Sequence, residues 1–353
     1  VNGTVLPRKL RVSLTLRTAL DLEGAPLPLV TSRDFPPTWG GALTKKNALF
    51  TPTTEREHVH AVYDAIATQW HHTRGKRGVL WPGARQFLQR LPPGSIVADV
   101  GCGDGKYFPA ILEAGSYVIG TDISMPLLQT AFGKGKGVGV GEKLVVPDTC
   151  KVSSPHRESL RDRPAVAVAD CMSLPLRGDS CDAAICIAVM HHLSTLERRV
   201  RCVQELVRVV RDGGTINIQA WALEQEENSR RRFASTDVFV PFNAQPKYLD
   251  KVMDVSHNDN KGKGTITTNA ASKKGSESMM TTTTKSVAEM YSEKYAKADF
   301  DEKKGLVVFQ RYCHMYRKGE LEDIVRQVPG AELLEGGYES GNYFVILKVG
   351  KKQ

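Results

Sequence analysis

The chain has 353 residues, of which 41% are hydrophobic, and its formal net charge is +9. Its mean hydropathy is −0.29, and no apolar run reaches the ~18–20 residues that cross a bilayer, so we expect a soluble protein without a membrane segment. The seven cysteines are odd in number and form no CxxC pair, which disfavours a disulfide framework or a zinc site. They predict reduced thiols in the cytoplasm, or in the nucleus as well. The basic excess indicates either a polyanionic partner or simple solubility.

Three stretches are expected to lie outside the folded core. Residues 1–52 start with basic residues and no acid, a composition typical of transit peptides and of disordered leaders alike. The stretches at about 133–164 and 243–305 lack apolar periodicity and are rich in Gly, Lys, Ser and Thr. We therefore predict a disordered leader and a single folded domain over 53–349 with two low-complexity insertions, which act as solvated linkers rather than nucleic-acid contacts.

Helical and strand patterns alternate through the rest of the chain. An amphipathic helix is predicted from residue 55, capped by Thr53 or Thr54. Apolar segments predict five strands, over residues 96–100, 117–121, 166–169, 183–189 and 215–220. A helix over 196–210 places valines on one face and arginines on the other, and residues 212–214 end it. Alternation of this kind predicts an α/β fold with a doubly wound parallel sheet.

The alternation ends near the C-terminus. After a predicted helix over 320–328, two apolar segments at 331–335 and 343–349 flank the string GGYESGN. Gly and Asn between two apolar runs indicate a hairpin, so the sheet should finish with an antiparallel strand.

The string VADVGCGDGKY at 97–107 is the most informative motif. An apolar strand enters a glycine-rich turn, and the following strand YVIGTD ends in Asp122, which could bind the hydroxyls of a ribose. Asp99, two residues before Gly101, would repel a pyrophosphate but suits a ligand that carries an ammonium and a sulfonium group. The motif therefore favours S-adenosylmethionine over a dinucleotide, the alternative being an ordinary tight strand–helix turn.

Two further strand ends carry candidate site residues. Asp170 could accept a hydrogen bond from an adenine amino group, with Cys171 and Met172 against the ring, or it could simply cap a helix. His191 and His192 follow the fourth strand at the edge where ligands bind in open α/β sheets. We expect one of the two to line the methyl-transfer pocket and the other to pack. A metal site is disfavoured because no third ligand accompanies them at ligand spacing.

Several longer strings resemble one family closely. They are EREHVHAVYDAIATQWHHTR, VADVGCGDGKY, ICIAVMHHLSTLERRV, AWALEQ, DVFVPF, RYCHMYRKGELEDI and ESGNYFVI. They look like the tRNA wobble-uridine carboxymethyl methyltransferases, relatives of the methyltransferase domain that is fused to an AlkB-type oxygenase. The resemblance covers most of residues 55–242 and 306–349. HHLSTLERRV, AWALEQ and RYCHMYRKGEL are its specific parts, because generic methyltransferases lack them.

The resemblance implies a class I fold, S-adenosyl-L-methionine as cofactor, and esterification of 5-carboxymethyluridine at the tRNA wobble position to the methoxycarbonylmethyl form. It also implies a small zinc-binding activator subunit as partner. The acceptor carboxylate, with a pKa near ~4, needs no general base, and an arginine suits its second oxygen. The alternatives are a carboxyl methyltransferase for small molecules or proteins, and a non-catalytic scaffold that binds tRNA.

The candidate site residues fall into three groups. The catalytic candidates are Arg74, His191 and Trp221. The cofactor-binding candidates are Tyr63, Asp99, Gly101, Cys102, Gly103, Asp122, Ile123, Asp170, Cys171, Met172, Ile187 and Ala188. The substrate-binding candidates are Trp81, Arg230, Arg231, Arg311, Tyr312 and His314. The chain departs from the family by extra residues between Arg74 and Trp81, and by Cys313 where relatives usually carry an aromatic residue.

Overall fold

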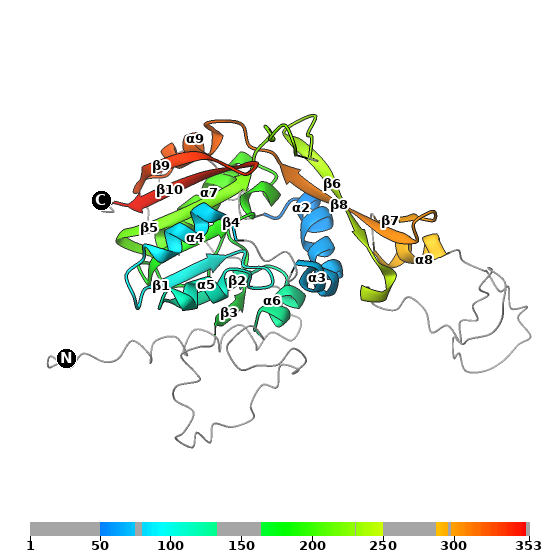
Figure 1. Ribbon diagram of the computed structural model, residues 1–353, viewed down its shortest axis with the longest axis horizontal. Coiled ribbons are helices and arrows are strands. Elements are labelled where there is room, and N and C mark those ends of the chain that lie inside the picture. Colours follow the sequence, from blue (N-terminus) through cyan, green and yellow to red (C-terminus); the bar gives the residue numbers. More distant parts are fainter. Residues whose placement is uncertain are drawn as a thin grey trace, which may run out of the picture.

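The computed structural model describes residues 50–74, 80–132, 164–229, 231–249, 287–295 and 298–350. They form a seven-stranded sheet with helices on both faces, and a smaller three-stranded sheet beside it (Figure 1). The strand order in the large sheet is β3-β2-β1-β4-β5-β10-β9. This order confirms the predicted doubly wound fold, because the chain moves outward from β1 first to one side and then to the other.

The parallel part of the large sheet has five strands. They are β1 (Ile96–Val100), β2 (Tyr117–Asp122), β3 (Ala165–Val168), β4 (Cys181–Ile187) and β5 (Val210–Trp221). The last two strands, β9 (Ala331–Glu339) and β10 (Asn342–Val349), form an antiparallel hairpin, and β10 pairs antiparallel with β5. The predicted C-terminal hairpin is therefore confirmed.

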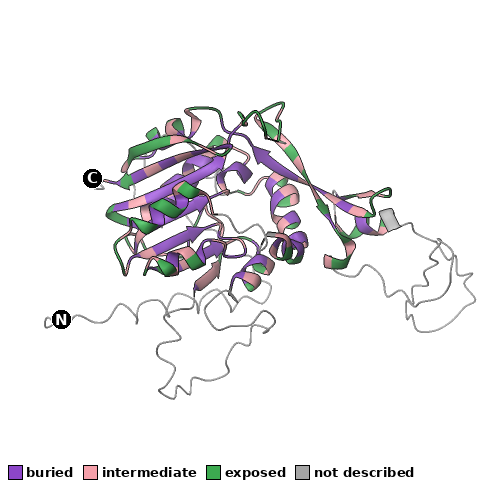
Figure 2. Ribbon diagram, viewed as in Figure 1, coloured by how far each residue is buried: buried purple, intermediate pink, exposed green. Residues whose placement is uncertain are grey.

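Both faces of this sheet are buried, as Figure 2 shows for its central strands. Val97 and Ile185 pack with α4 (Pro82–Gln89), α5 (Phe108–Glu113) and α6 (Met125–Phe132). The next residues along the same strands pack on the other face, against α7 (Leu196–Val209) and α9 (Glu320–Arg326). Side chains alternate between the faces of a strand, so near-continuous apolar runs are what a doubly covered sheet requires.

The N-terminal helix is continuous but not uniform. It consists of α2 (Thr53–Glu55), the π-helical turn η3 (Arg56–His60) and α3 (Ala61–Arg74). The residue at its N-cap is Pro52, and no side chain caps the helix. The predicted cap by Thr53 or Thr54 is therefore wrong, because the helix already includes both.

The smaller sheet was not expected from the sequence. It contains β6 (Asp237–Ala244), β8 (Leu306–His314) and β7 (Ala298–Asp301) in the antiparallel order β6-β8-β7. The short helices η7 (Pro246–Tyr248) and α8 (Val287–Lys294) flank it. One apolar cluster joins this sheet to α3, with Ile66 and Trp70 from the helix and Val307 and Phe309 from β8. The small sheet is thereby fastened to the N-terminal helix.

The predicted insertion at 243–305 is wrong in part. The end of β6, helix α8 and strand β7 all fall inside it, whereas residues 250–286 lie outside the described residues. Phe242 pairs with Phe309 across the two strands, so partners distant in sequence determine this sheet and no local alternation reveals it. Residues 1–49 of the predicted leader and 133–163 of the other insertion also lie outside the described residues.

The polar face predicted for α7 also differs from the structure. Its predicted apolar face is confirmed, since Val200, Val203 and Val207 are buried. The arginines on the same helix are not on a solvent face, because Arg198 is only 1% exposed and Arg199 only 6%. Acidic groups from other elements meet both of them, and only the tertiary structure brings these acids into contact.

Among the described residues, no helix has both the length and the apolar character needed to cross a membrane.

Close packing between β2 and α5 leads to a stability prediction. An added Cβ at Gly120 would contact the Phe108 ring and lie 2.9 Å from Cys102 Sγ. We expect Gly120→Ala to lower the free energy of unfolding by about 1–3 kcal/mol, because the core must shift to admit the methyl group. The measurement is urea denaturation. Gly178→Ala is the control, since its new methyl group would meet Arg208 at ordinary contact distances, with O at 3.4 Å and Cγ at 4.0 Å. Equal effects of the two substitutions would contradict the prediction.

Candidate active site

A cavity opens at the carboxyl ends of the parallel strands, between them and the N-terminal helix. Most of the residues predicted from the sequence line it. These are Tyr63, Trp81, Asp99, Gly101, Cys102, Gly103, Asp122, Ile123, Asp170, Cys171, Ile187, Ala188, His191, Trp221 and Arg311. The topology explains their convergence, because β1 lies between β2 and β4 and their carboxyl ends meet at one edge of the sheet.

The glycine-rich turn after β1 is held by the end of β2. Gly101 has φ +72°, and a Cβ there would collide with the Val189 side chain, so only glycine fits. The Asp122 carboxylate accepts from the Gly103 amide at 2.8 Å through Oδ2 and from the Ser124 amide at 2.9 Å through Oδ1. Each oxygen keeps a second lone pair, so the same acid can fix the turn and still accept from a ligand hydroxyl.

Asp99 is a buried acid with one oxygen that no described residue satisfies. It is 2% exposed, and its Oδ2 accepts no hydrogen bond from any described residue. Burial raises its pKa to about 8, assisted by the negative charges of Asp122 and Asp104. Burial also raises the pKa of Asp122 to about 6, although its backbone hydrogen bonds oppose the shift. A ligand that brings a positive charge and N–H donors would stabilise both carboxylates.

The acid after β3 is held in place by two contacts. Asp170 Oδ1 accepts from the Met172 amide at 3.0 Å, and Oδ2 accepts from Arg198 Nη2 at 3.2 Å. Cys171 lines the cavity as predicted. Met172 does not, because its side chain is 1% exposed and packs in the core. The predicted contact of Met172 with an adenine ring is therefore wrong.

The two histidines both line the cavity, so the expectation that one of them only packs is wrong. His192 Nδ1 donates to the Tyr312 carbonyl at 2.8 Å, because a carbonyl can only accept. In the neutral ring this leaves Nε2 as the acceptor for the Tyr63 hydroxyl, also at 2.8 Å. The His191 ring stacks on Trp221, with the ring centroids 4.8 Å apart.

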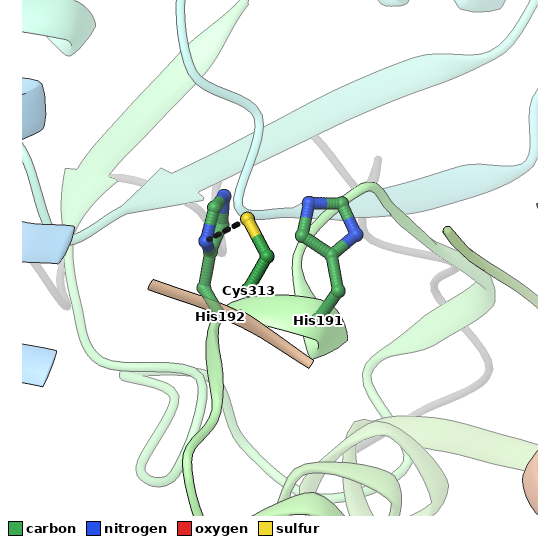
Figure 3. A group of neighbouring side chains, drawn as sticks. All are labelled: His191, His192 and Cys313. Atoms are coloured by element: carbon green, nitrogen blue, oxygen red, sulfur yellow. Dashed lines mark hydrogen bonds between the residues drawn. The ribbon is translucent and has the colours of Figure 1, made fainter. Parts of the chain in front are cut away.

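Figure 3 shows a third potential metal ligand beside them. The ligand atoms of His191, His192 and Cys313 lie within 4.8 Å of one another, although no cysteine accompanies the histidines in the sequence. Both nitrogens of His192 are already hydrogen-bonded, and burial raises the pKa of Cys313 to about 12, so the thiol stays protonated. The cluster is therefore better explained as a hydrogen-bonded wall of the cavity than as a metal site.

Arg311 is a buried cation that has no counter-ion among the described residues. It lies on β8, is 7% exposed and lines the cavity. Its Cζ lies 5.6 Å from the ring centroids of both Trp70 and Phe242. Its guanidinium forms no hydrogen bond or ion pair with any described residue, and its Nε is fully buried. Aromatic faces compensate a buried charge only in part, so this site favours an anionic ligand.

Comparisons with known proteins agree with this geometry. A family model described as "Methyltransferase domain" matches residues 98–218. The chain is 31% identical over 300 residues to the tRNA (carboxymethyluridine(34)-5-O)-methyltransferase of Schizosaccharomyces pombe, an alignment that covers 83% of this chain and 96% of that protein. The chain belongs to this family of tRNA (carboxymethyluridine(34)-5-O)-methyltransferases.

Other similar proteins extend the comparison. The enzyme ALKBH8 of Macaca fascicularis is 30% identical over 382 residues, which cover 98% of this chain and 52% of that protein. The chain thus spans about half the length of this relative. A solved complex of the Haloferax volcanii Trm112 methyltransferase activator with a methyltransferase is 14% identical, with a TM-score of 0.43, and covers 82% of this chain and 98% of that one.

S-adenosyl-L-methionine is the cofactor of a methyltransferase domain of this kind. The cavity fits such a ligand. The orphaned Asp99 Oδ2 needs a donor, which an ammonium group supplies, and the Asp122 oxygens retain lone pairs for hydroxyl groups.

Two family motifs meet beside Trp221. In AWALEQ, Gln225 Nε2 donates to the Gly341 carbonyl at 2.9 Å, and Glu224 accepts from the Tyr343 hydroxyl at 3.0 Å. Gly341 and Tyr343 belong to the string ESGNYFVI, which forms the turn of the hairpin and the first part of β10. These contacts hold the end of β5, and hence Trp221, against the last strand of the sheet.

Two of the predicted substrate contacts are buried elsewhere. Tyr312 and His314 do not line the cavity, although both belong to the family string RYCHMYRKGEL. The Tyr312 hydroxyl donates to Asp237, and His314 bridges Asp237 (Nδ1, 3.0 Å) and Glu320 (Nε2, 2.6 Å). The structure therefore corrects their predicted role. They tie β6 and β8 of the small sheet to α9.

The remaining predicted residues either lie near the cavity or fall outside the residues that the structure describes. Arg231 lies with its Cζ 4.3 Å from the Trp221 ring centroid. Arg74 is the last residue of α3, and its side chain and the whole of Arg230 are outside the described residues. Trp81 is the N-cap residue of α4 and lines the cavity.

Sequence reasoning missed other residues of the cavity wall. They include Glu55, His60, Trp70, Lys106, Tyr107 and Arg198. The sequence did contain a signal that Glu55 and Arg198 are site residues, because both belong to strings shared with the family. Helical periodicity alone does not reveal it, since it assigns charged residues to the solvent face.

Cofactor binding should release protons from the buried acids. The positive charge of the cofactor should lower the pKa of Asp99 from about 8, so at pH 7 this group changes from mostly protonated to ionised. We expect S-adenosylmethionine binding at pH 7 to release up to about one proton. Calorimetric titration in buffers of different ionisation enthalpy measures this release.

Asp99→Asn is the test variant for proton release, and Asp182→Asn is its control. Asp182 lies in the same sheet and pairs with Arg211, away from the cavity. Asp99→Asn should release fewer protons than the wild type, and Asp182→Asn should release as many. Equal release by all three proteins would contradict the role of Asp99.

Proposed function

We propose that this chain catalyses the S-adenosylmethionine-dependent methyl esterification of 5-carboxymethyluridine at the wobble position of tRNA, giving 5-methoxycarbonylmethyluridine. The observation that carries the proposal is Arg311, a guanidinium without a counter-ion among the described residues, in the same cavity as Asp99, whose Oδ2 accepts no hydrogen bond from them. Such a cavity suits a cationic methyl donor together with an anionic acceptor. The names of the relatives supply the identity of the acceptor.

For this reaction the protein mainly has to orient the acceptor and the cofactor. The acceptor carboxylate, with a pKa near ~4, is ionised at neutral pH, so no general base is required. Arg311 would hold one carboxylate oxygen by charge-assisted hydrogen bonds, which leaves the other free to attack. The cofactor supplies a methyl group bound to a sulfonium sulfur. A carboxylate held in line with that methyl group gains most of its rate from proximity and from loss of its water shell.

In this proposal each of three acids binds a different part of the cofactor. Asp99 would pair with the ammonium group, Asp122 with the ribose hydroxyls, and Asp170 with the adenine amino group. The support is positional: Asp99 lies next to the end of β1, Asp122 ends β2 and Asp170 follows β3, and all three line the cavity. The other predicted cofactor residues form the walls, namely Tyr63, Gly101, Cys102, Gly103, Ile123, Cys171, Ile187 and Ala188.

The target nucleotide would enter on the aromatic side. Trp81 and the stacked pair Trp221–His191 line the cavity, and stacking on such rings holds a splayed RNA base. Arg74 remains a proposed catalytic residue, and Arg230 and Arg231 are proposed to bind the substrate beside it. The net charge of +9 supports a polyanionic partner.

The second proposed partner is the small zinc-binding activator subunit. The edge of the large sheet at β3 supports this, because it is short and apolar, with Val168 49% exposed and Met125 nearby 50% exposed. The opposite edge, β9, also exposes apolar side chains such as Leu334, but it carries Glu332 and Glu335 as well, and charges of this kind protect an edge strand from pairing. We therefore propose that the activator subunit covers the β3 edge.

Arg311→Met tests the acceptor site. We expect kcat/KM for tRNA with 5-carboxymethyluridine to fall about 100-fold, the effect of losing ~3 kcal/mol of charge-assisted hydrogen bonding. Affinity for S-adenosylhomocysteine should stay within about twofold, because the substitution lies outside the cofactor acids. The measurements are single-turnover methylation with labelled cofactor and calorimetric titration.

A neutral analogue of the acceptor makes the test specific. Wild-type protein should bind tRNA that carries the carboxymethyl group more tightly than tRNA with the corresponding amide, and Arg311→Met should lose this preference. Arg326→Met, at an exposed pair with Asp323, is the control and should retain it. An unchanged preference in Arg311→Met would contradict the acceptor site. Full activity on free carboxylic acids without tRNA would instead favour a small-molecule methyltransferase.

Val168→Asp tests the activator edge. A buried, unpaired carboxylate would oppose association, so we expect affinity for the zinc-binding subunit to fall at least about tenfold. The measurement is co-purification followed by analytical ultracentrifugation. Leu334→Asp, 52% exposed on the opposite edge strand, is the matched control and should leave the complex intact. Loss of the complex in the control alone would place the partner at β9.

A further inference from the structure

Arg198 is the largest side chain among those that are almost completely buried. A guanidinium at 1% exposure is tolerated only if its charge and donors are matched. Its Nε contacts both oxygens of Glu55, at 3.1 and 2.9 Å, and its Nη1 donates to the Phe50 carbonyl at 3.3 Å. Its Nη2 donates to Asp170 Oδ2 at 3.2 Å. One side chain therefore joins the start of the N-terminal helix to the acid after β3.

The carboxylate of Glu55 is itself fully used. It is 0% exposed, and its Oε1 also accepts from the amide and the hydroxyl of Ser194, at 2.7 and 2.8 Å. Burial alone would lower the pKa of Arg198, but Asp170 and Glu55 outweigh that effect and raise it. The three charged groups thus form one closed network in which each partner restricts the next.

This network lies in the cavity wall and at the base of the helix that completes the cavity. Glu55, Asp170 and Arg198 all line it. The helix that starts beside Glu55 continues through the π-helical turn η3 to Tyr63 and Trp70, which line the cavity further along. Arg198 therefore links Asp170 directly to the first turn of the helix that carries Tyr63 and Trp70.

We propose that Arg198 is a positioning residue that couples cofactor binding to the docking of the N-terminal helix. It orients Asp170 toward the adenine of the cofactor and at the same time holds Glu55. Cofactor binding then stabilises the docked position of the helix that carries Tyr63 and Trp70, so the acceptor side of the cavity is held more firmly when the cofactor is bound. By linkage, the docked helix strengthens cofactor binding to the same extent. The inference rests on the proposed place of Asp170 at the adenine.

Calorimetric titration with S-adenosylhomocysteine tests the coupling without any turnover. We expect Arg198→Met to weaken binding about tenfold or more, and Arg198→Lys to weaken it less, since lysine keeps the charge but cannot reach both acids. Arg208→Met is the matched control. Arg208 lies on the same helix and pairs with Glu205, outside the cavity, so its loss should lower the melting temperature but leave the affinity unchanged.

A double-mutant cycle separates positioning from direct contact. Glu55→Gln should weaken S-adenosylhomocysteine binding in the wild type but have no further effect in Arg198→Met, because Glu55 acts through Arg198. Additive effects would overturn the inference, as would wild-type affinity in a folded Arg198→Met protein. Should Arg198→Met fail to fold, the same cycle with Arg198→Lys decides.

Hydrogen exchange gives the second readout. S-adenosylhomocysteine should increase the protection of amides in residues 56–74 of the wild type and of Arg208→Met, but not of Arg198→Met. Equal gains in all three proteins would overturn the coupling. Failure of the wild type to bind S-adenosylhomocysteine would count against the proposed function itself, whereas the differences between variants judge the role of Arg198.

Discussion

Buried charge at the carboxyl ends of the strands is the constraint on which the rest of the structure depends. A charge removed from water needs a partner, and the chain meets this need in two ways. Arg198 finds Glu55 and Asp170 inside the protein, which binds separate elements together. Asp99 and Arg311 find no such partner among the described residues. Satisfied charges thus build the scaffold, and unsatisfied charges mark where ligands bind.

The cavity is built from two parts of different origin. The large sheet supplies the acids and the glycine-rich turn, which suit the cofactor and occur within the stretch matched by the general methyltransferase model. The N-terminal helix and the small sheet supply Trp70 and Arg311, on the side proposed for the acceptor. The similarity to the S. pombe relative extends over 83% of the chain and so includes more than the general domain. In the proposed function, recognition of an acidic acceptor therefore depends on these additions to the fold.

The network around His314 shows why position in a family motif does not by itself assign a role. Its string suggests contact with RNA, because histidine and tyrosine stand among basic residues. In the structure the His314 ring lies between Asp237 and Glu320 and fastens the small sheet to α9. Arg311, three residues earlier on the same strand, faces the cavity. Side chains alternate between the two faces of β8, so one motif contains both a supporting residue, His314, and a candidate substrate-binding residue, Arg311.

Local patterns by themselves determined the doubly wound sheet, the glycine-rich turn and the acids at the strand ends. These features depend on neighbours in sequence, since a strand, a turn and a strand end are each set by a few consecutive residues. Only the tertiary structure decided that Arg198 is buried, that Met172 turns into the core, and that β6 and β8 pair across a long intervening segment. The reason is physical: the free energy of a buried charge or a strand pair depends on partners that chain proximity does not specify.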